Sequence, residues 1–215
     1  MIELHYYPSN ASMAPHLLLE ELGVPFSLRL VDRSTDAHKS PDYLRLNPNG
    51  LIPVLQDGDL VLYEAAAICL HLVDTHPQAG LAPALGTPER AHFYKWLVWM
   101  TNSLQSTLTL YFYPERWASP DHLQGATALK ARAEAKVGAL LEQVEAEFAR
   151  HGGPWLLGEH FTALDPYLLM LCRWTREFGS PARSLPHLGP YLHRMLQRPA
   201  VQKVLSTEGI HPPFV

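Results

Sequence analysis

Cysteine is scarce in this sequence, and a long apolar run is missing altogether. The two cysteines, Cys69 and Cys172, lie in apolar, helix-like stretches without CxxC spacing, so a disulfide framework is excluded. The longest uncharged stretch of interest, residues 96–114, contains seven Ser, Thr, Asn or Gln side chains, too many for a bilayer span. The first ten residues lack a basic segment followed by an apolar one. We therefore expect no signal peptide, no insertion into a membrane, and a cytoplasmic location.

Positive charge is also sparse, and no part of the chain concentrates it. The formal net charge is -4 over 215 residues. Residues 1–77 hold 4 Lys and Arg against 10 Asp and Glu, a net of -6, whereas residues 78–215 hold 13 against 11, a net of +2. Because nucleic-acid binders normally carry a basic patch, we expect no nucleic-acid partner.

The usual metal and hydrolase motifs are missing as well. The 12 histidines are scattered, without HExxH or paired CxxC spacing, and His71 and His76 are five positions apart, off one helical face. No GxSxG elbow of a serine hydrolase occurs in the sequence. We expect neither a metal site nor a serine-hydrolase triad.

Short apolar runs alternate with short helical patterns over the first 77 residues. Strands are predicted at residues 2–7, 26–31, 54–56 and 60–62, and helices at 12–22, 41–46 and 64–76. Gly23 is placed to end the first helix, and Asp57-Gly58-Asp59 to turn a hairpin. This order predicts an α/β domain with a mixed sheet and helices on both faces.

Proline and glycine then interrupt the pattern, and after them it is helical throughout. Residues 77–88 contain three prolines and two glycines and show no apolar period. Apolar side chains recur every three or four positions at 93–108 and at 137–148, and Thr162 and Asp165 have capping-box spacing. We predict a first domain at 1–77, a linker at 78–88 and an all-α domain at 89–215.

One candidate for ligand binding is the run from Asn47 to Leu55, which carries Pro53 at the start of a predicted strand. A proline there removes a donor from the ladder, and a cis Ile52–Pro53 bond would turn the Ile52 N–H and C=O outward. These groups could then pair with an extended peptide. An ordinary edge proline remains the alternative.

A second candidate is Glu64 with Ala65, at the start of a predicted helix. The first N–H groups of the helix can bind a carboxylate, and Glu64 beside them can bind an ammonium, so the corner suits a free amino-acid head. The alternative is an acidic residue favoured by the helix dipole alone.

Two loops complete the set. The run from Tyr6 to Ser12 brings hydroxyl groups to a helix start, where the dipole favours an anion, although Ser12 as a plain N-cap is the alternative. His38 and Lys39 could offer positive charge to a second carboxylate, or form a solvated pair.

Together these segments resemble a known family. The runs HKSPDYLRLNPNGLIPVL and LYEAAAICLHL resemble the first domain of cytosolic glutathione transferases, and FTALDPYLL resembles the capping-box motif of their second domain. The resemblance covers nearly the whole chain, and YYPSNAS followed by MAPHLLLEELG is especially similar to the bacterial beta class. It implies a thioredoxin-like α/β first domain and an all-α helical bundle. It also implies a homodimer that uses glutathione as a co-substrate, without a cofactor, and a small hydrophobic electrophile.

The resemblance also implies roles for the positions that match. Ile52, flanked by Leu51 and a cis Pro53, would pair with the cysteinyl backbone of glutathione, and Glu64 and the Ala65 N–H would hold its γ-glutamyl head. His38 and Lys39 would hold the glycine carboxylate. Three residues of the helical domain would line the acceptor site, namely Gln105, Tyr111 and Trp174.

The sequence departs from the beta class where the chemistry is expected. The class cysteine before the serine is Ala11 here, and a helical histidine of that class is Gln105. A mixed disulfide with the protein is therefore not expected, and the thiol must be activated by another group. Ser12 is the first choice, followed by Ser9 and Tyr6, with the Asn10 amide as a further candidate. Conjugation is the predicted activity, with glutathione-dependent disulfide or peroxide reduction, or a non-catalytic binding module, as alternatives.

Overall fold

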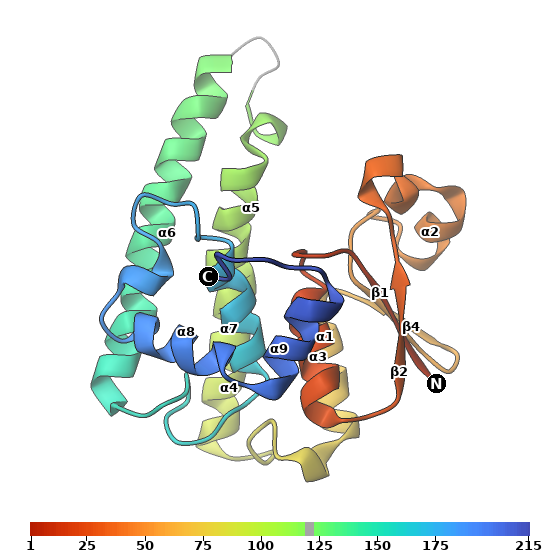
Figure 1. Cartoon of the computed structure of the whole chain (residues 1–215), viewed down its shortest axis with the longest axis horizontal. Helices are drawn as coiled ribbons and strands as arrows, with labels where there is room; N and C mark the ends of the chain where they lie inside the picture. Colours follow the sequence, from red (N-terminus) through yellow and green to blue (C-terminus); the bar gives the residue numbers. More distant parts are fainter. Residues whose placement is uncertain (119–122) are drawn as a thin grey trace.

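The computed structural model describes residues 1–118 and 123–215, which form a sheet region and a helical region (Figure 1). The sheet has the order β2-β1-β3-β4. β1 pairs parallel with β2, and β3 pairs antiparallel with β1 and β4. The bounds are β1 (Ile2–Tyr6), β2 (Phe26–Leu30), β3 (Val54–Asp57) and β4 (Leu60–Tyr63). This mixed sheet confirms the predicted thioredoxin-like architecture.

Helices cover both faces of the sheet, as predicted. Leu4 and Leu55 pack in one core with α1 (Met13–Leu22) and α3 (Ala65–Thr75). On the other face Val54 packs against Tyr43 of α2 (Pro41–Leu46), whose ring centroid lies 6.0 Å from that of His5. The alternation of side chains along each strand produces these two layers.

Two helices begin one residue later than predicted, for different reasons. Ser12 does not cap α1, because its hydroxyl is bonded to the Tyr7 backbone instead. Glu64 precedes α3 with φ of 74°, a conformation outside the helical region. At its other end α1 stops at Gly23, whose φ of 65° continues no helix.

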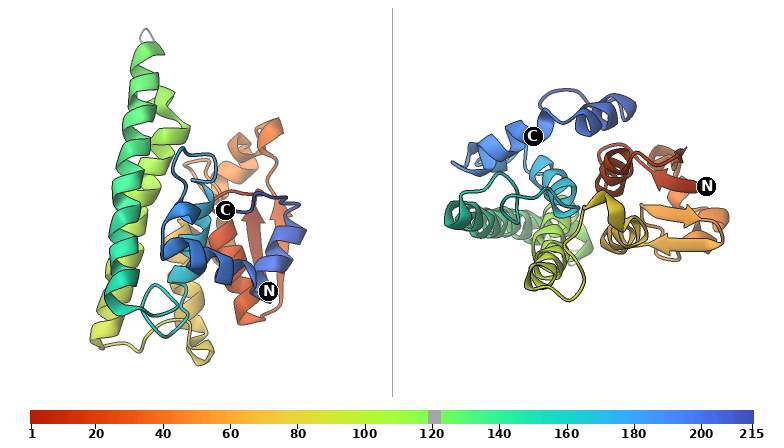
Figure 2. Two further views of the ribbon diagram at one scale, coloured as in Figure 1. Left: turned by 60° about the vertical axis from the view of Figure 1, so that its left-hand side comes forward. Right: turned by 90° about the horizontal axis from the view of Figure 1, so that it is seen from below.

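After α3 the described chain consists of helices and the loops that connect them. α4 (Pro88–Trp99) runs through a π-helical stretch, η4 (Met100–Gln105), into α5 (Ser106–Phe112). α6 (Leu123–His151) packs against α5, and the left view of Figure 2 shows the length of α6 beside the helical run that ends in α5. α7 (Leu164–Arg173), α8 (Leu188–Leu196) and α9 (Pro199–Thr207) follow. Among the described helices, none combines the length and apolar character needed to cross a membrane.

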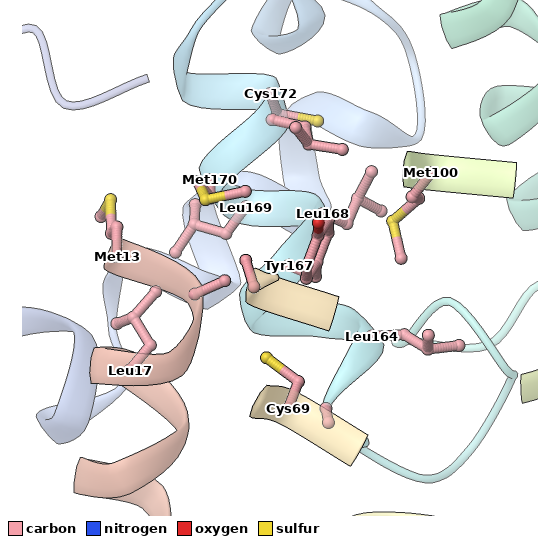
Figure 3. Packing of buried hydrophobic residues seen from close by; sticks show 14 of the residues in the cluster. Met13, Leu17, Cys69, Met100, Leu164, Tyr167, Leu168, Leu169, Met170 and Cys172 are labelled. Atoms are coloured by element: carbon pink, nitrogen blue, oxygen red, sulfur yellow. The ribbon is translucent and has the colours of Figure 1, made fainter. Parts of the chain in front are cut away.

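α7 is the centre of the molecule. All ten of its residues are buried, as expected of a helix that is covered on every side. Figure 3 shows Tyr167 and Leu168 of α7 among Met13 and Leu17 of α1 and Met100 of η4. The same core joins the sheet region to the helices, so the two regions are packed together rather than merely linked.

Both cysteines lie in this core. Cys69 of α3 and Cys172 of α7 are buried as free thiols. Burial raises the pKa of each thiol far above its ordinary value. Because the thiolate is the reactive form, neither cysteine is placed or poised to react with a ligand.

The capping box before α7 forms with Asp in place of the usual Glu. Asp165 Oδ2 accepts the Thr162 N–H at 2.8 Å, and Asp165 Oδ1 accepts the Leu156 N–H at 3.0 Å. The shorter side chain therefore fixes both the start of α7 and the loop before it. The Asp165 carboxyl is fully buried, and this burial raises its pKa to about 6.

Candidate functional site

A cavity of about 580 Å³ opens where loops at one edge of the sheet face the ends of α5 and α7. Its walls come from the β1–α1 loop, from η1 (Arg33–Thr35) and η2 (Ala37–Lys39), from residues 44–52, and from α5, η5 (Pro114–Arg116) and the turn after α7. Eight residues predicted from the sequence line it: Ser9, Asn10, His38, Lys39, Leu51, Ile52, Gln105 and Trp174. Six other predicted residues do not line the cavity: Tyr6, Ser12, Pro53, Glu64, Ala65 and Tyr111.

The β1–α1 loop presents Ser9 to the cavity in a left-handed conformation, with φ of 59°. Its N–H donates to Glu208 Oε2 at 2.9 Å, and Arg173 Nη2 donates to its Oγ at 3.2 Å. Burial lowers the pKa of Arg173 to about 10, so its guanidinium remains charged at neutral pH. Ser9 Oγ thus accepts a bond from a cation, and its own proton is free to point at a ligand.

Ser12 lies in the same loop but faces the other way. It is fully buried, its hydroxyl donates to Tyr7 O at 3.1 Å, and the Tyr7 N–H donates to it at 3.2 Å. The Ser12 hydroxyl therefore uses both its donor and an acceptor position in bonds to the Tyr7 backbone. Tyr6 packs its ring against His16 of α1, with 6.1 Å between centroids. Asn10 lines the cavity, and its Oδ1 accepts the Ala11 N–H at 2.6 Å.

The Ile52–Pro53 peptide bond is cis. The segment before it is held firmly, because Tyr43 Oη and Asn47 Nδ2 each donate to Leu51 O at 2.8 Å. Gly50 is required here, since its φ is +61° and a Cβ would lie 3.1 Å from His38 O. Within the described chain, no group bonds to the Ile52 N–H or C=O. The edge therefore offers one donor and one acceptor beside the cavity.

Glu64 lies near this edge without lining the cavity. The register pairs Val54 with Tyr63, which places Glu64 next to Pro53 at the end of the hairpin. Its side chain is exposed, and its backbone adopts φ of 74° and ψ of 111°. A residue other than glycine pays conformational energy there, and such outliers cluster at binding sites. The first N–H groups of α3 follow directly at Ala65.

Positive charge gathers around the cavity. Arg33, Lys39, Arg116 and Arg176 line it together with His38, and none of its described lining residues is Asp or Glu. Burial, followed by the charges of Arg33 and Lys39, lowers the pKa of His38 below its usual value. His38 is therefore mainly neutral at pH 7. Lys39 Nζ is paired with Asp36 Oδ1 at 3.0 Å, so the arginines supply most of the unpaired charge.

The wall opposite the sheet is aromatic. Trp174 and Phe112 line the cavity with their ring centroids 6.2 Å apart. Gln105 lies beside them, and its Oε1 accepts a hydrogen bond from Tyr167 Oη. Tyr111 is turned away, because its ring packs on Phe178 with 4.4 Å between centroids. This wall suits a flat apolar molecule.

Sequence reasoning missed the arginines and Tyr113. Arg33, Arg116 and Arg176 come from three segments far apart in the chain, and no local pattern connects them. Tyr113 and Phe112 follow the helical spacing of core residues, although Phe112 is 43% exposed at the cavity. The one available signal was the change at Pro114, which ends the apolar helix just before a charged turn.

The fold and the cavity define a class of protein, in which a thioredoxin-like sheet with a cis-proline edge is joined to a helical domain around a small-molecule site. Comparison with known proteins supports this classification. Residues 8–75 match the family model of the glutathione S-transferase N-terminal domain, and residues 99–199 match that of the C-terminal domain. The chain belongs to the glutathione S-transferase family.

Individual relatives match over the whole length. Glutathione S-transferase GST-4.5 of Xanthomonas campestris is 33% identical over 98% of this chain and all of that protein. A glutathione transferase homologue from Sulfitobacter, solved with bound glutathione, superimposes with a TM-score of 0.88 at 27% identity, covering 98% of this chain and 99% of that one. A beta-class enzyme of Sphingomonas chungbukensis gives 0.82 at 30% identity, covering 97% and 100%.

Proposed function

We propose that this transferase binds glutathione along the Ile52–Pro53 edge and transfers it to a small aromatic electrophile held against Phe112 and Trp174. The observation that carries the proposal is the cavity itself. Around one space lie the Ser9 hydroxyl in the β1–α1 loop, an unpaired backbone edge and an aromatic wall. Glutathione would lie along the backbone edge with its thiol at the hydroxyl, and a flat acceptor would lie against the aromatic wall.

Each end of glutathione has a partner in this arrangement. The Ile52 N–H and C=O pair with the cysteinyl backbone as an added strand, between Leu51 and Pro53. The γ-glutamyl carboxylate takes the first N–H groups of α3 at Ala65, and its ammonium takes Glu64. Lys39 provides a charge for the glycine carboxylate, and the neutral His38 provides a hydrogen bond.

Ser9, rather than Ser12, is proposed to activate the thiol. A free thiol has a pKa of about 8.5, and lowering it by ~2 units requires about 2.7 kcal/mol. The start of α1 contributes ~0.3–1 kcal/mol, and a hydroxyl that donates to the thiolate adds ~1.5–3 kcal/mol. Arg173 strengthens this donor by its bond to Ser9 Oγ. Asn10, whose amide also reaches the cavity, is the second candidate.

Conjugation to 1-chloro-2,4-dinitrobenzene tests the proposal. The thiolate sulfur bonds to the ring carbon that carries chlorine, and chloride leaves with the electron pair. We expect turnover well above the uncatalysed rate, saturable in both substrates. Absence of turnover, in a protein shown to be folded and to bind glutathione, would reject transferase activity and leave a binding module.

A further inference from the structure

The cavity holds more positive charge than glutathione can use. Arg33, Arg116 and Arg176 all line it in addition to Lys39, and its described lining contains no carboxylate. In the proposed binding mode, Lys39 meets the glycine carboxylate and the start of α3 meets the γ-glutamyl carboxylate. The single charge of the glycine carboxylate cannot balance Lys39 and all three arginines, so positive charge remains unpaired when glutathione is bound.

Two of these arginines are held around one tyrosine. Arg33 Nη2 donates to Tyr113 Oη at 3.0 Å, and the Arg116 guanidinium lies 4.0 Å from the centroid of the Tyr113 ring. Among residues 1–118 and 123–215, no carboxylate lies within ion-pair distance of Arg33 or Arg116. A guanidinium stacked on a ring keeps its N–H edge available for a carboxylate.

The third arginine lies at the aromatic wall. Arg176 follows Trp174 in the turn after α7, and its only carboxylate neighbour in the described chain is Glu177, 3.9 Å away and at the limit of an ion pair. Charge from η1, η5 and this turn thus surrounds the space beside Phe112 and Trp174. A neutral acceptor would gain nothing from this charge.

We propose that the acceptor substrate of this transferase is an anion, an aromatic electrophile that carries a carboxylate bound by Arg33 and Arg116 next to Tyr113. Arg176, two positions after Trp174, also lines the cavity and adds to the attraction. The inference rests on the proposed function, because it assigns the acceptor half of the same cavity. It accounts for the charge that the glutathione half leaves unpaired.

The test compares two ligands that differ only in this charge. S-(4-carboxy-2,6-dinitrophenyl)glutathione and its methyl ester share the peptide and the ring, so their affinity ratio isolates the carboxylate. Calorimetry on the wild type should give the acid about tenfold tighter binding than the ester, or ~1.4 kcal/mol. The ratio should fall as salt is raised, because the arginines are partly exposed.

Variants then assign the effect to the arginines. In Arg33→Gln/Arg116→Gln the ratio should fall to near one, mainly through loss of affinity for the acid. The control Arg150→Gln removes a charge from α6 that does not line the cavity and should keep the wild-type ratio. The ratio of kcat/KM for 4-chloro-3,5-dinitrobenzoate to that for its methyl ester should change in the same way: it should fall in the double variant and stay at the wild-type value in Arg150→Gln. Each single variant gives a folded alternative if the double variant does not fold.

Two results would overturn the inference. One is equal affinity of the wild type for acid and ester. The other is an equal loss for both ligands in the variants, which would assign the arginines to the peptide. S-Methylglutathione separates this failure from that of the proposed function: if it binds while the acid shows no advantage, only the anionic acceptor is wrong. If it does not bind at all, the glutathione site is wrong as well.

Discussion

Ser9 and Ser12 lie three positions apart in one loop, yet their hydroxyls have different surroundings. Ser9 faces the cavity and accepts a bond from Arg173, whereas Ser12 is buried between the backbone groups of Tyr7. The distinction depends on the left-handed conformation of Ser9, which Glu208 holds from 199 positions away. No local sequence pattern predicts that contact.

A pair of alanine variants separates the two roles. Ser9→Ala should raise the pKa of bound glutathione by one unit or more and lower kcat/KM, because the thiolate loses a donor. Ser12→Ala should leave that pKa unchanged and reduce the free energy of unfolding by ~1–3 kcal/mol, because the Tyr7 N–H loses its acceptor. Thiolate absorbance against pH and denaturant unfolding measure the two effects. A shifted thiol titration in Ser12→Ala alone would return the catalytic role to Ser12.

Part of the candidate site could be predicted from the sequence because it follows one continuous motif. His38, Lys39, Leu51 and Ile52 follow one continuous motif, and all four line the cavity. The opposite wall is assembled from separate turns, so Gln105 and Trp174 were predicted whereas Phe112, Tyr113 and the arginines were not. Tyr111 illustrates the limit, because helical spacing alone did not indicate that its ring packs on Phe178.

The start of α7 depends on the side chain of Asp165. Asp165 accepts bonds from Thr162 and Leu156 inside the core, and burial raises its pKa to about 6 from the ordinary 3.8. The folded protein therefore binds the proton of the Asp165 carboxyl more tightly than the unfolded chain does. The associated stability is fully present below about pH 4 and is lost as pH rises through about 6.

The direction of this pH dependence can be measured by comparing the wild type with Asp165→Asn, whose side chain cannot ionise. The difference in unfolding free energy, wild type minus variant, should decrease between about pH 4 and pH 6. Urea unfolding at several pH values within that range gives the difference. An increase across the same range would mean that the bonds from the two N–H groups outweigh burial and hold the pKa below its ordinary value.

Most elements were predictable because their signals are local. The Asp57-Gly58-Asp59 turn, Gly23 and the apolar spacing of the helices each belong to a few neighbouring residues. The π-helical stretch at Met100–Gln105 was not predicted, because an extra residue per turn hardly disturbs a spacing of three or four. It precedes Thr109 and Phe112, so it helps set which side chains reach the cavity.

For the whole molecule, we predict a two-fold homodimer. Val98 of α4 and Leu60 of β4 are 55% and 40% exposed, large values for apolar side chains. The acidic first 77 residues and the mildly basic remainder would attract each other across an interface between unlike domains. Light scattering at micromolar concentration should give twice the chain mass of 24.2 kDa. A mass near 24.2 kDa would contradict the dimer.

Glutathione binding is the direct test of the proposed site. Calorimetric titration should show one site per chain. Glu64→Ala should weaken binding by ~1.5–3 kcal/mol, because the ammonium of the γ-glutamyl head loses its charged partner. Glu159→Ala removes an exposed glutamate that does not line the cavity, and it should bind like the wild type. Absence of binding to the folded wild type, or equal affinities of the wild type and Glu64→Ala, would contradict the site described above.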